Sequence, residues 1–229
     1  HTAGEMSVAL AHEITQPLGA IENYALAARR RAAVARPDMP HVLDLLDKVG
    51  GQATRAGDVV NRMRSMAQRH ELDAKPIDVQ RAVLECIGML KMDCDLRDIR
   101  LVATASGTLP PAVADEIHLQ QVLLNLLRNA MEATEMAEPG AMREIKVSIG
   151  LRNANTVLVE VADRGVGIAT DDLERVFESF YSTKSSGLGV GLSICRKLIE
   201  AHGGKLWASQ HMGGGALFSL TLPAASTSG

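Results

Sequence analysis

The sequence has little of what marks secreted, membrane-spanning or zinc-binding proteins. It contains three cysteines, Cys86, Cys94 and Cys195, and none of them forms a C-x-x-C pair. Such a scattered, odd set fits reduced thiols in a core better than a disulfide framework or a zinc site. No apolar run approaches the roughly 18 residues of a membrane span, and the first residues lack a signal-peptide pattern. We therefore expect a soluble, cytoplasmic chain without membrane contact.

An excess of basic residues is also missing. The 24 lysines and arginines are outnumbered by 27 aspartates and glutamates, which gives a formal net charge of -3. Without a general positive field, nucleic acid is not an expected partner. The chain is long enough and apolar enough to form a hydrophobic core. Its 229 residues, of which 46% are hydrophobic, suffice for one large domain or two modest ones.

The first third of the chain has helical periodicity. Apolar residues recur at helical spacing over residues 3–36, and after the break R-P-D-M-P they alternate at spacings of four and three from Val42 to Ala67. Two long helices joined by a short proline-containing turn predict an antiparallel hairpin. One apolar stripe per helix cannot bury both sides of such a hairpin. We therefore expect a homodimeric four-helix bundle.

From Lys75 onward, short strands alternate with helices, which predicts an α/β sandwich. Strands are expected over residues 100–105, 144–151, 156–163, 205–209 and 216–223, and helices over residues 79–92, 115–136 and 190–202. The expected domains are residues 1–72 for the hairpin and 73–224 for the sandwich, with a disordered tail at 225–229.

The stretch A-H-E-I-T-Q-P-L, residues 11–18, places polar groups on the outer face of the first helix. At about 100° per residue, His12 lies almost opposite the apolar stripe, Gln16 follows one turn later, and Glu13 sits about a quarter turn away. Pro17 removes the amide that would bond to the carbonyl of Glu13, at a cost of about 3 kcal/mol in a helix interior. This cost favours a bend that has a functional role. The simpler alternative is a surface histidine beside a kink that has no functional role.

A second group of polar side chains follows Asp115, which is placed to cap a helix. Beside that helix's apolar face runs a polar row that includes Asn125 and Asn129 at a spacing of four. Asparagine is a mediocre helix former and seeks hydrogen-bond partners. Magnesium prefers oxygen ligands, so this row is a candidate magnesium site.

Two glycine-rich segments follow. In D-R-G-V-G-I, Asp163 ends a strand and can accept a hydrogen bond from the amino group of a base, while Gly165 and Gly167 permit close approach to the backbone. Alone, D-x-G-x-G is often just a turn. The segment S-S-G-L-G-V-G-L, residues 185–192, opens a helix whose free amides favour phosphate. The loop at 178–184 between them is placed like a lid. Neither a Rossmann fingerprint nor a Walker loop is present.

Together these segments resemble the catalytic core of bacterial sensor histidine kinases, and the resemblance covers nearly the whole chain. A-H-E-I-T-Q-P-L resembles the H-box, N-L-L-R-N-A-M-E-A the N-box, D-R-G-V-G-I the G1 box, F-E-S-F-Y-S-T-K the F-box and G-L-G-V-G-L the G2 box. The form of the H-box and N-box and the closing G-G-G-A-L-F-S-L-T-L-P are most similar to FixL-type kinases without their sensor domain. The resemblance implies a dimerisation and phosphotransfer hairpin and an ATP-binding domain of the GHKL, or Bergerat, type.

The resemblance also implies roles for individual residues. His12 would accept the γ-phosphoryl group of ATP, Glu13 would polarise its imidazole, and Gln16 falls where relatives orient water for dephosphorylation of the partner. Asp163 would bind adenine. Asn129, with Asn125, would hold magnesium, and Arg128 and Lys184 would contact phosphate oxygens. The lid and the phosphate end of the site would be shaped by Gly187, Gly189 and Gly191.

The implied partners are a second copy, through the hairpin, and the receiver domain of a response regulator. Phosphoryl transfer needs mainly positioning and charge neutralisation, which suits these residue types. In two respects the chain departs from many relatives: Ser179 stands where they have proline, and Ala216 where they have threonine.

Two alternative functions remain. A hydrolytic ATPase clamp, as in DNA gyrase and mismatch-repair proteins, carries a water-activating glutamate four residues before the magnesium asparagine, where this chain has Asn125. A pseudokinase scaffold would bind nucleotide or partners without transferring phosphate.

Overall fold

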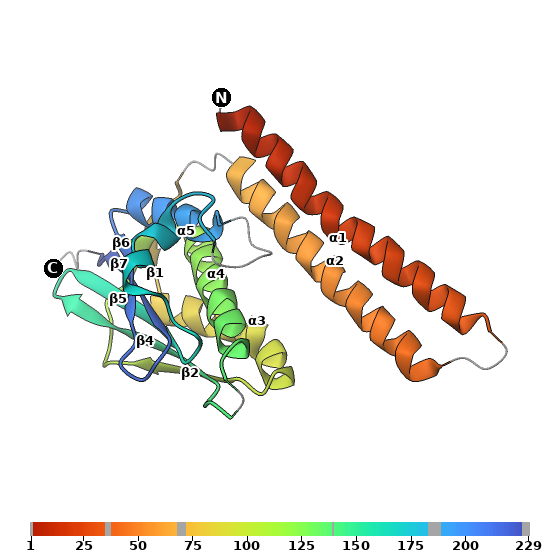
Figure 1. Ribbon diagram of the computed structural model, residues 1–229. Coiled ribbons are helices and arrows are strands. Elements are labelled where there is room, and N and C mark those ends of the chain that lie inside the picture. Colours follow the sequence, from red (N-terminus) through yellow and green to blue (C-terminus); the bar gives the residue numbers. More distant parts are fainter. Residues whose placement is uncertain (1, 35–37, 68–71, 139, 183–188, 226–229) are drawn as a thin grey trace. The chain divides into compact units, whose positions relative to one another are not determined.

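The computed structural model describes residues 2–34, 38–67, 72–138, 140–182 and 189–225 (Figure 1). Backbone contacts divide the chain into two compact units, His1–Arg69 and His70–Gly229. Among the described residues, no helix has both the length and the apolar character needed to cross a membrane.

The first unit is the predicted helical hairpin. Helix α1 spans Thr2–Ala32 and continues through Pro17, and α2 spans Met39–Ala67. Where the helices pack, Ala28, Val42 and Leu45 are buried, with Tyr24 and Ala27 beside them. Several larger apolar side chains stay about half exposed in the single chain. Leu18, Leu43, Leu46 and Val60 are each between 47% and 55% exposed.

The second unit is the predicted α/β sandwich. Its five-stranded sheet has the order β2-β4-β5-β7-β6. The strands are β2 (Arg100–Ala105), β4 (Glu144–Asn153), β5 (Thr156–Asp163), β6 (Lys205–Gln210) and β7 (Ala216–Pro223). Strands β2 and β4 run parallel and the other neighbours run antiparallel.

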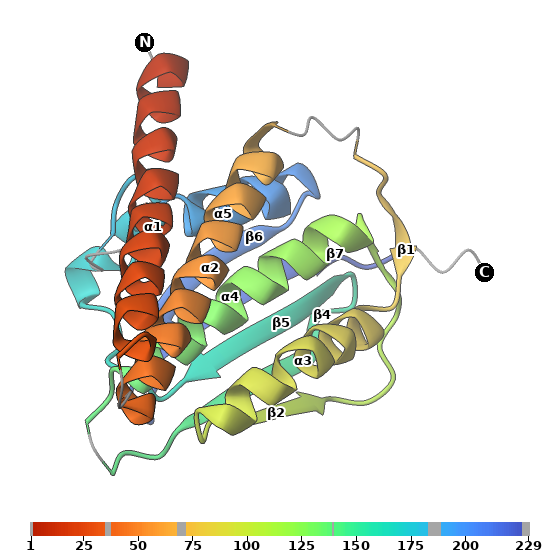
Figure 2. The same cartoon turned by 90° about the vertical axis from the view of Figure 1, so that its right-hand side faces the viewer.

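Three helices cover one face of this sheet: α3 (Val79–Leu96), α4 (Glu116–Glu135) and α5 (Gly191–Ala201), as Figure 2 shows. Alternate strand residues point toward them, because side chains in a strand alternate between the two faces. In β4 the buried set is Ile145, Val147 and Ile149. Helix α4 supplies four fully buried leucines: Leu119, Leu123, Leu126 and Leu127. The core lies between these two layers.

The structure adds elements that the sequence did not predict. Strands β1 (Lys75–Ile77) and β3 (Ala112–Ala114) form a separate two-stranded antiparallel sheet. Two short 3₁₀ helices, η1 (Thr170–Asp172) and η2 (Arg175–Phe177), precede the lid segment. Elements of three residues are too short to give a periodic signal.

A buried histidine ties the start of α4 to the end of α5. Asp115 caps α4 by accepting the N–H groups of Ile117 and His118 at 2.9 and 3.2 Å. Its own N–H donates to Nε2 of His202 at 2.9 Å, and Nδ1 of His202 lies 2.6 Å from the Leu198 carbonyl. This pattern requires a neutral imidazole with its proton on Nδ1. The two helices that flank the predicted nucleotide site are thereby fixed at one end.

Candidate functional site

Asp163 lies at the end of the central strand β5 and is 1% exposed. Its Oδ1 accepts two backbone hydrogen bonds, from Gly165 N–H at 2.8 Å and from Ala216 N–H at 3.1 Å. Gly165 follows on the same loop, whereas Ala216 begins the neighbouring strand β7. The two bonds orient the carboxylate from two sides. A carboxylate fixed in this way can accept a hydrogen bond from a ligand at the end of the sheet.

Glycines bring three segments together around Asp163. A side chain at Gly165 would overlap the backbone of Ala133 in α4, and one at Gly215, where φ is +87°, would overlap the carbonyl of Asp163. The N–H of Val166 also donates to the Ala133 carbonyl at 3.3 Å. At Gly167, where φ is +74°, an added Cβ would lie 3.3 Å from the Gly215 carbonyl oxygen. These close approaches join the loop after β5 to both α4 and the β6–β7 turn.

The predicted polar row lies on α4, the helix that this loop contacts. Asn125 and Asn129 are partly exposed, and Arg128 between them is exposed. The Asn125 Nδ2 group donates to the Cys195 sulfur at 3.3 Å, and the Asn125 Oδ1 lies beside Gly191, the first residue of α5. Asn125 is therefore packed between α4 and α5 with its amide nitrogen directed inward.

The start of α5 borders the same region. Val190 is its N-cap and makes no side-chain capping bond, so the first amides of α5 receive no capping side chain. Gly189 has φ of +65° and contacts the Tyr181 backbone, and its carbonyl accepts the N–H of Phe180 at 3.0 Å. Lys184 and Gly187, two further predicted site residues, lie outside the described residues.

The segment that leads to the lid is anchored on α5. The guanidinium of Arg196 lies over the Phe177 ring, 3.7 Å from its centroid, and its Nη1 is 3.1 Å from a Glu174 oxygen. Ser179, where many relatives have proline, donates to Ser193 Oγ at 3.3 Å. A side-chain hydrogen bond thus holds the lid segment at this position.

The predicted phosphorylation segment lies on α1, in the other unit. The helix is described at His12 and Glu13, but their side chains lie outside the described part. Farther along the same helix, Gln16 and Asn23 are exposed and Pro17 is buried. The Gln16 side chain is therefore exposed in the single chain, and the orientation of His12 stays a prediction.

Sequence reasoning missed the β6–β7 turn as part of the site. Arg164 Nη1 donates to the Gly213 carbonyl at 2.9 Å, and Gly215 and Ala216 flank the Asp163 carboxylate. Three successive glycines before a strand were the available signal. Among the described residues, no cluster of three or more His, Cys, Asp or Glu side chains could hold a metal ion.

The comparisons with known proteins agree with this geometry. Residues 114–226 match the family model of histidine kinase-, DNA gyrase B- and HSP90-like ATPases. The chain is 39% identical to the sensor protein FixL of Bradyrhizobium diazoefficiens over 97% of this chain and 44% of the relative. It is 36% identical to the C4-dicarboxylate transport sensor protein DctS of Rhodobacter capsulatus, over 97% of this chain and 34% of that protein.

Solved structures give the same result. A structure of histidine kinase ThkA in complex with the response regulator TrrA aligns with a TM-score of 0.74 and 25% identity, covering 97% of this chain and 62% of that one. Full-length ShkA in complex with AMPPNP aligns with a TM-score of 0.64 and 27% identity, covering 97% of this chain and 46% of that one. The chain belongs to the sensor histidine kinases and contains their GHKL-type ATPase fold. It spans less than half the length of the FixL and DctS proteins.

Proposed function

We propose that this chain is an ATP-dependent protein-histidine kinase. The γ-phosphoryl group of ATP is transferred to the imidazole of His12, with ADP as the leaving group, and then to an aspartate on the receiver domain of a response regulator. The observation that carries the proposal is the convergence of α4, the Gly165–Gly167 loop and the β6–β7 turn on Asp163. We assign residues 1–72 to dimerisation and phosphotransfer, residues 73–224 to ATP binding and catalysis, and residues 225–229 to a tail.

The nucleotide end of the mechanism rests on Asp163. Its carboxylate accepts the adenine amino group, since an ionised carboxylate is a hydrogen-bond acceptor only and two backbone bonds hold it in place. Gly165 and Gly167 let the loop after β5 pack closely against α4 and the β6–β7 turn, which keeps the carboxylate at the end of the sheet where the base is proposed to bind. The phosphates then extend toward α5, where amides at its start favour anions. Gly187, Gly189 and Gly191 shape that end, and Arg128 and Lys184 neutralise phosphate charge.

Magnesium fits the amide oxygens of α4. Asn129 is partly exposed on the α4 face beside the Gly165 loop, and Asn125 uses its Nδ2 as a donor to Cys195, which leaves a carbonyl oxygen of the right chemistry. When bound, the ion neutralises charge on the phosphates during transfer. Asn129, with Asn125, would hold it.

The acceptor end rests on His12. An ordinary imidazole has a pKa of about 6.5, so the neutral, nucleophilic form dominates near pH 7 without a strong base. Glu13 polarises the ring. Because His12 and Asp163 belong to different compact units, the rate of transfer depends on how the two units are placed during catalysis.

The hairpin supplies a dimer interface. Leu18, Leu43, Leu46 and Val60 are about half exposed in the single chain, and two such stripes bury each other in a four-helix bundle. We therefore propose a homodimer through α1 and α2. The response regulator would dock on the exposed face that carries Gln16, where Gln16 orients water for dephosphorylation. A partner of that kind is seen in the ThkA structure with TrrA.

We place the activity in the cytoplasm, where ATP and receiver domains are available. An upstream sensor domain would set the signal. Nucleic acid and membrane have no part in the proposal.

Incubation with γ-labelled ATP and magnesium tests the proposal against its two alternatives. Acid-labile, base-stable label on the wild type but not on His12→Ala supports the kinase. Release of free phosphate without labelled protein supports the ATPase clamp, and neither product supports a scaffold. The clamp is the weaker alternative because Asn125 occupies the position of its catalytic glutamate and donates to a buried thiol.

A further inference from the structure

Helix α3 has an outer face that the kinase chemistry leaves without a role. Its inner face is buried against the core through Ala82, Val83, Cys86, Leu90 and Cys94. On the outer face, Leu84, Met92 and Leu96 are 51%, 74% and 76% exposed. Together with Gly88 they form a ridge at a spacing of four residues, which we call the α3 ridge. An exposed apolar row of this kind marks an interaction surface.

Gly88 is the second observation. It lies in the interior of an 18-residue helix, and a Cβ added there would meet no atom within 4 Å. Glycine at such a position costs roughly 0.5–1 kcal/mol relative to alanine. Nothing in the described fold needs that glycine. A bare backbone in the middle of an apolar ridge instead suits the close approach of another helix.

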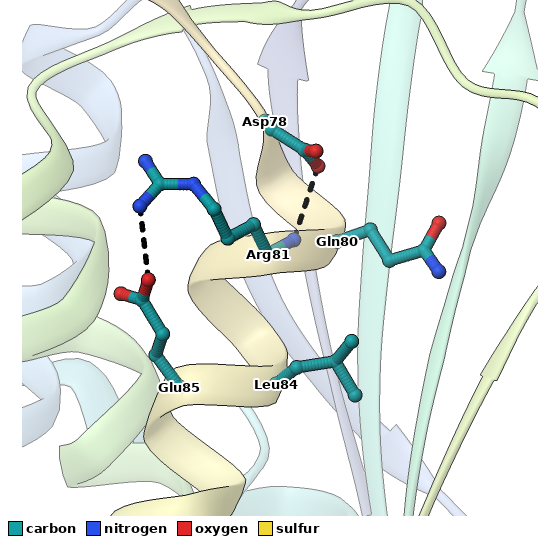
Figure 3. Close-up of a pocket in the computed structure, with 5 residues that line it drawn as sticks. All are labelled: Asp78, Gln80, Arg81, Leu84 and Glu85. Carbon is teal, nitrogen blue, oxygen red and sulfur yellow. Dashed lines mark hydrogen bonds and ion pairs between the residues drawn. The ribbon is translucent and has the colours of Figure 1, made fainter.

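Two surface hollows flank Gly88. One is lined by Asp78, Gln80, Arg81, Leu84 and Glu85, where Arg81 pairs with Glu85 at 2.9 Å (Figure 3). Arg81 also pairs with Glu116 of α4 at 2.6 Å, so its contact with a second copy would add to these pairs within the chain. The other is lined by Gly88, Lys91, Met92, Asp95 and Leu96. Counted outward from Gly88, the two linings match: Leu84 and Met92 are four residues away, and Gln80 and Leu96 are eight.

The charges around Gly88 are antisymmetric. Arg81 and Asp95 lie seven residues on either side, and Glu85 and Lys91 lie three residues on either side. When two copies of α3 pack antiparallel about a two-fold axis at Gly88, each residue lies level with its mirror position in the other copy. Each pair then has opposite charges. Arg81 and Asp95 lie within about 20° of Gly88 around the helix, so these charges flank the contact line directly.

We infer that the α3 ridge is a self-complementary docking surface for a second copy of this chain. Apolar Leu84 meets Met92 of the other copy, the two Gly88 backbones cross, and Arg81 faces the other Asp95. At 1.5 Å per residue, α3 is about 27 Å long, and a single helix pair falls below the roughly 1,200 Å² of a standard interface. The association is therefore weak and concentration-dependent. The α3 ridge belongs to the second compact unit, so this association can join hairpin dimers to one another.

Substitution at Gly88 separates folding from association. Gly88→Gln fills a position with open space, so it raises the melting temperature of the full chain. The same side chain blocks the helix crossing, so self-association in sedimentation equilibrium falls by roughly tenfold. If the melting temperature rises and self-association is unchanged, Gly88 is not at a contact and the inference is wrong.

Charge reversal gives a sharper test. Arg81→Asp and Asp95→Arg each place like charges level with one another, so each variant alone loses self-association. Mixed in equal amounts they recover it, because the introduced aspartate of one chain then faces the introduced arginine of the other, and the remaining native Asp95 faces the remaining native Arg81. Both variants keep the hairpin and the Asp163 site, so ATP binding is the control and stays unchanged. Loss without recovery on mixing contradicts the pairing.

Cross-linking locates the axis. The test uses the full chain, whose native cysteines are buried. A cysteine introduced by Gly88→Cys lies at the proposed two-fold axis, so glutathione disulfide is expected to oxidise the two copies to a disulfide-linked dimer. Leu96→Cys, on the same ridge, is the matched control, since the two copies of residue 96 lie about 24 Å apart in the paired helices. Equal cross-linking of both variants overturns the inference. So does hydrogen-exchange protection of α3 that is independent of concentration, because another partner then covers the ridge.

Discussion

The backbone N–H of Ala216 donates a hydrogen bond to Oδ1 of Asp163 over 3.1 Å, although the two residues are 53 positions apart in the sequence. This bond links the end of β5 to the start of β7. With the bond from Gly165 it orients the carboxylate. The nucleotide proposal depends on a carboxylate held in this orientation.

Asp163→Asn tests the proposed role of this carboxylate with an isosteric change. The amide oxygen still accepts the N–H groups of Gly165 and Ala216, so the melting temperature changes little. The amide nitrogen is a donor and opposes the adenine amino group, so ATP affinity in calorimetric titration falls by roughly 10- to 100-fold. An unchanged affinity would place the base elsewhere.

Gly215→Ala and Gly214→Ala form a matched pair. The two glycines have φ of +87° and +85°, but an added Cβ overlaps the Asp163 carbonyl only at Gly215 and meets nothing within 4 Å at Gly214. Both substitutions carry the backbone cost of about 1–2 kcal/mol. Gly215→Ala adds displacement of the Asp163 strand end, so urea denaturation shows a larger loss and ATP binding falls. Equal losses would mean that the close approach to Asp163 is unimportant.

Cys195 gives a pH prediction. Burial raises the pKa of its thiol from 9.0 to about 12. Between these values the unfolded chain releases a proton that the folded chain retains, so stability is intact below pH 9 and declines as the pH rises toward 12. The slope from this one group is about 1.4 kcal/mol per pH unit. Urea denaturation from pH 8 to pH 10.5 should show a flatter decline for Cys195→Ala than for the wild type, and parallel curves would contradict the assignment.

Pro17 offers a test of the proposed bend in α1. The helix continues through this buried proline, and Pro17→Ala restores the missing amide, which stabilises the helix by up to about 3 kcal/mol. If the bend controls the approach of the nucleotide-bearing unit to His12, the variant has a higher melting temperature. Its rate of autophosphorylation or of partner dephosphorylation then differs from that of the wild type. Unchanged rates of both reactions would show that the kink is only structural.

Much of the fold could be predicted because its elements are long and periodic. The strands at Arg100–Ala105, Thr156–Asp163 and Ala216–Pro223 match the expected bounds. Helix α3 runs on to Leu96 because buried Cys94 continues its apolar face beyond residue 92. Strands β1 and β3 were missed, since such three-residue segments gain strand character only by pairing with each other across 35 to 39 positions.

The candidate site was harder to predict because its contacts are distant in sequence. The segments around Asp163 and Asn129 could be singled out from their residue types. The bond from Asn125 to Cys195 joins residues 70 positions apart, and no local pattern reports it. The same holds for Gly215, whose need for glycine becomes clear only when the Asp163 carbonyl is seen beside it.

The central claim is that ATP bound beside Asp163 phosphorylates His12, and mapping the phosphorylated residue tests it most directly. The chain is incubated with ATP and magnesium, digested at alkaline pH and analysed by mass spectrometry. Phosphohistidine at residue 12, absent from Asp163→Asn at limiting ATP, is the predicted result. Phosphate on any other residue, or an unmodified His12 while ATP is consumed, would contradict the account.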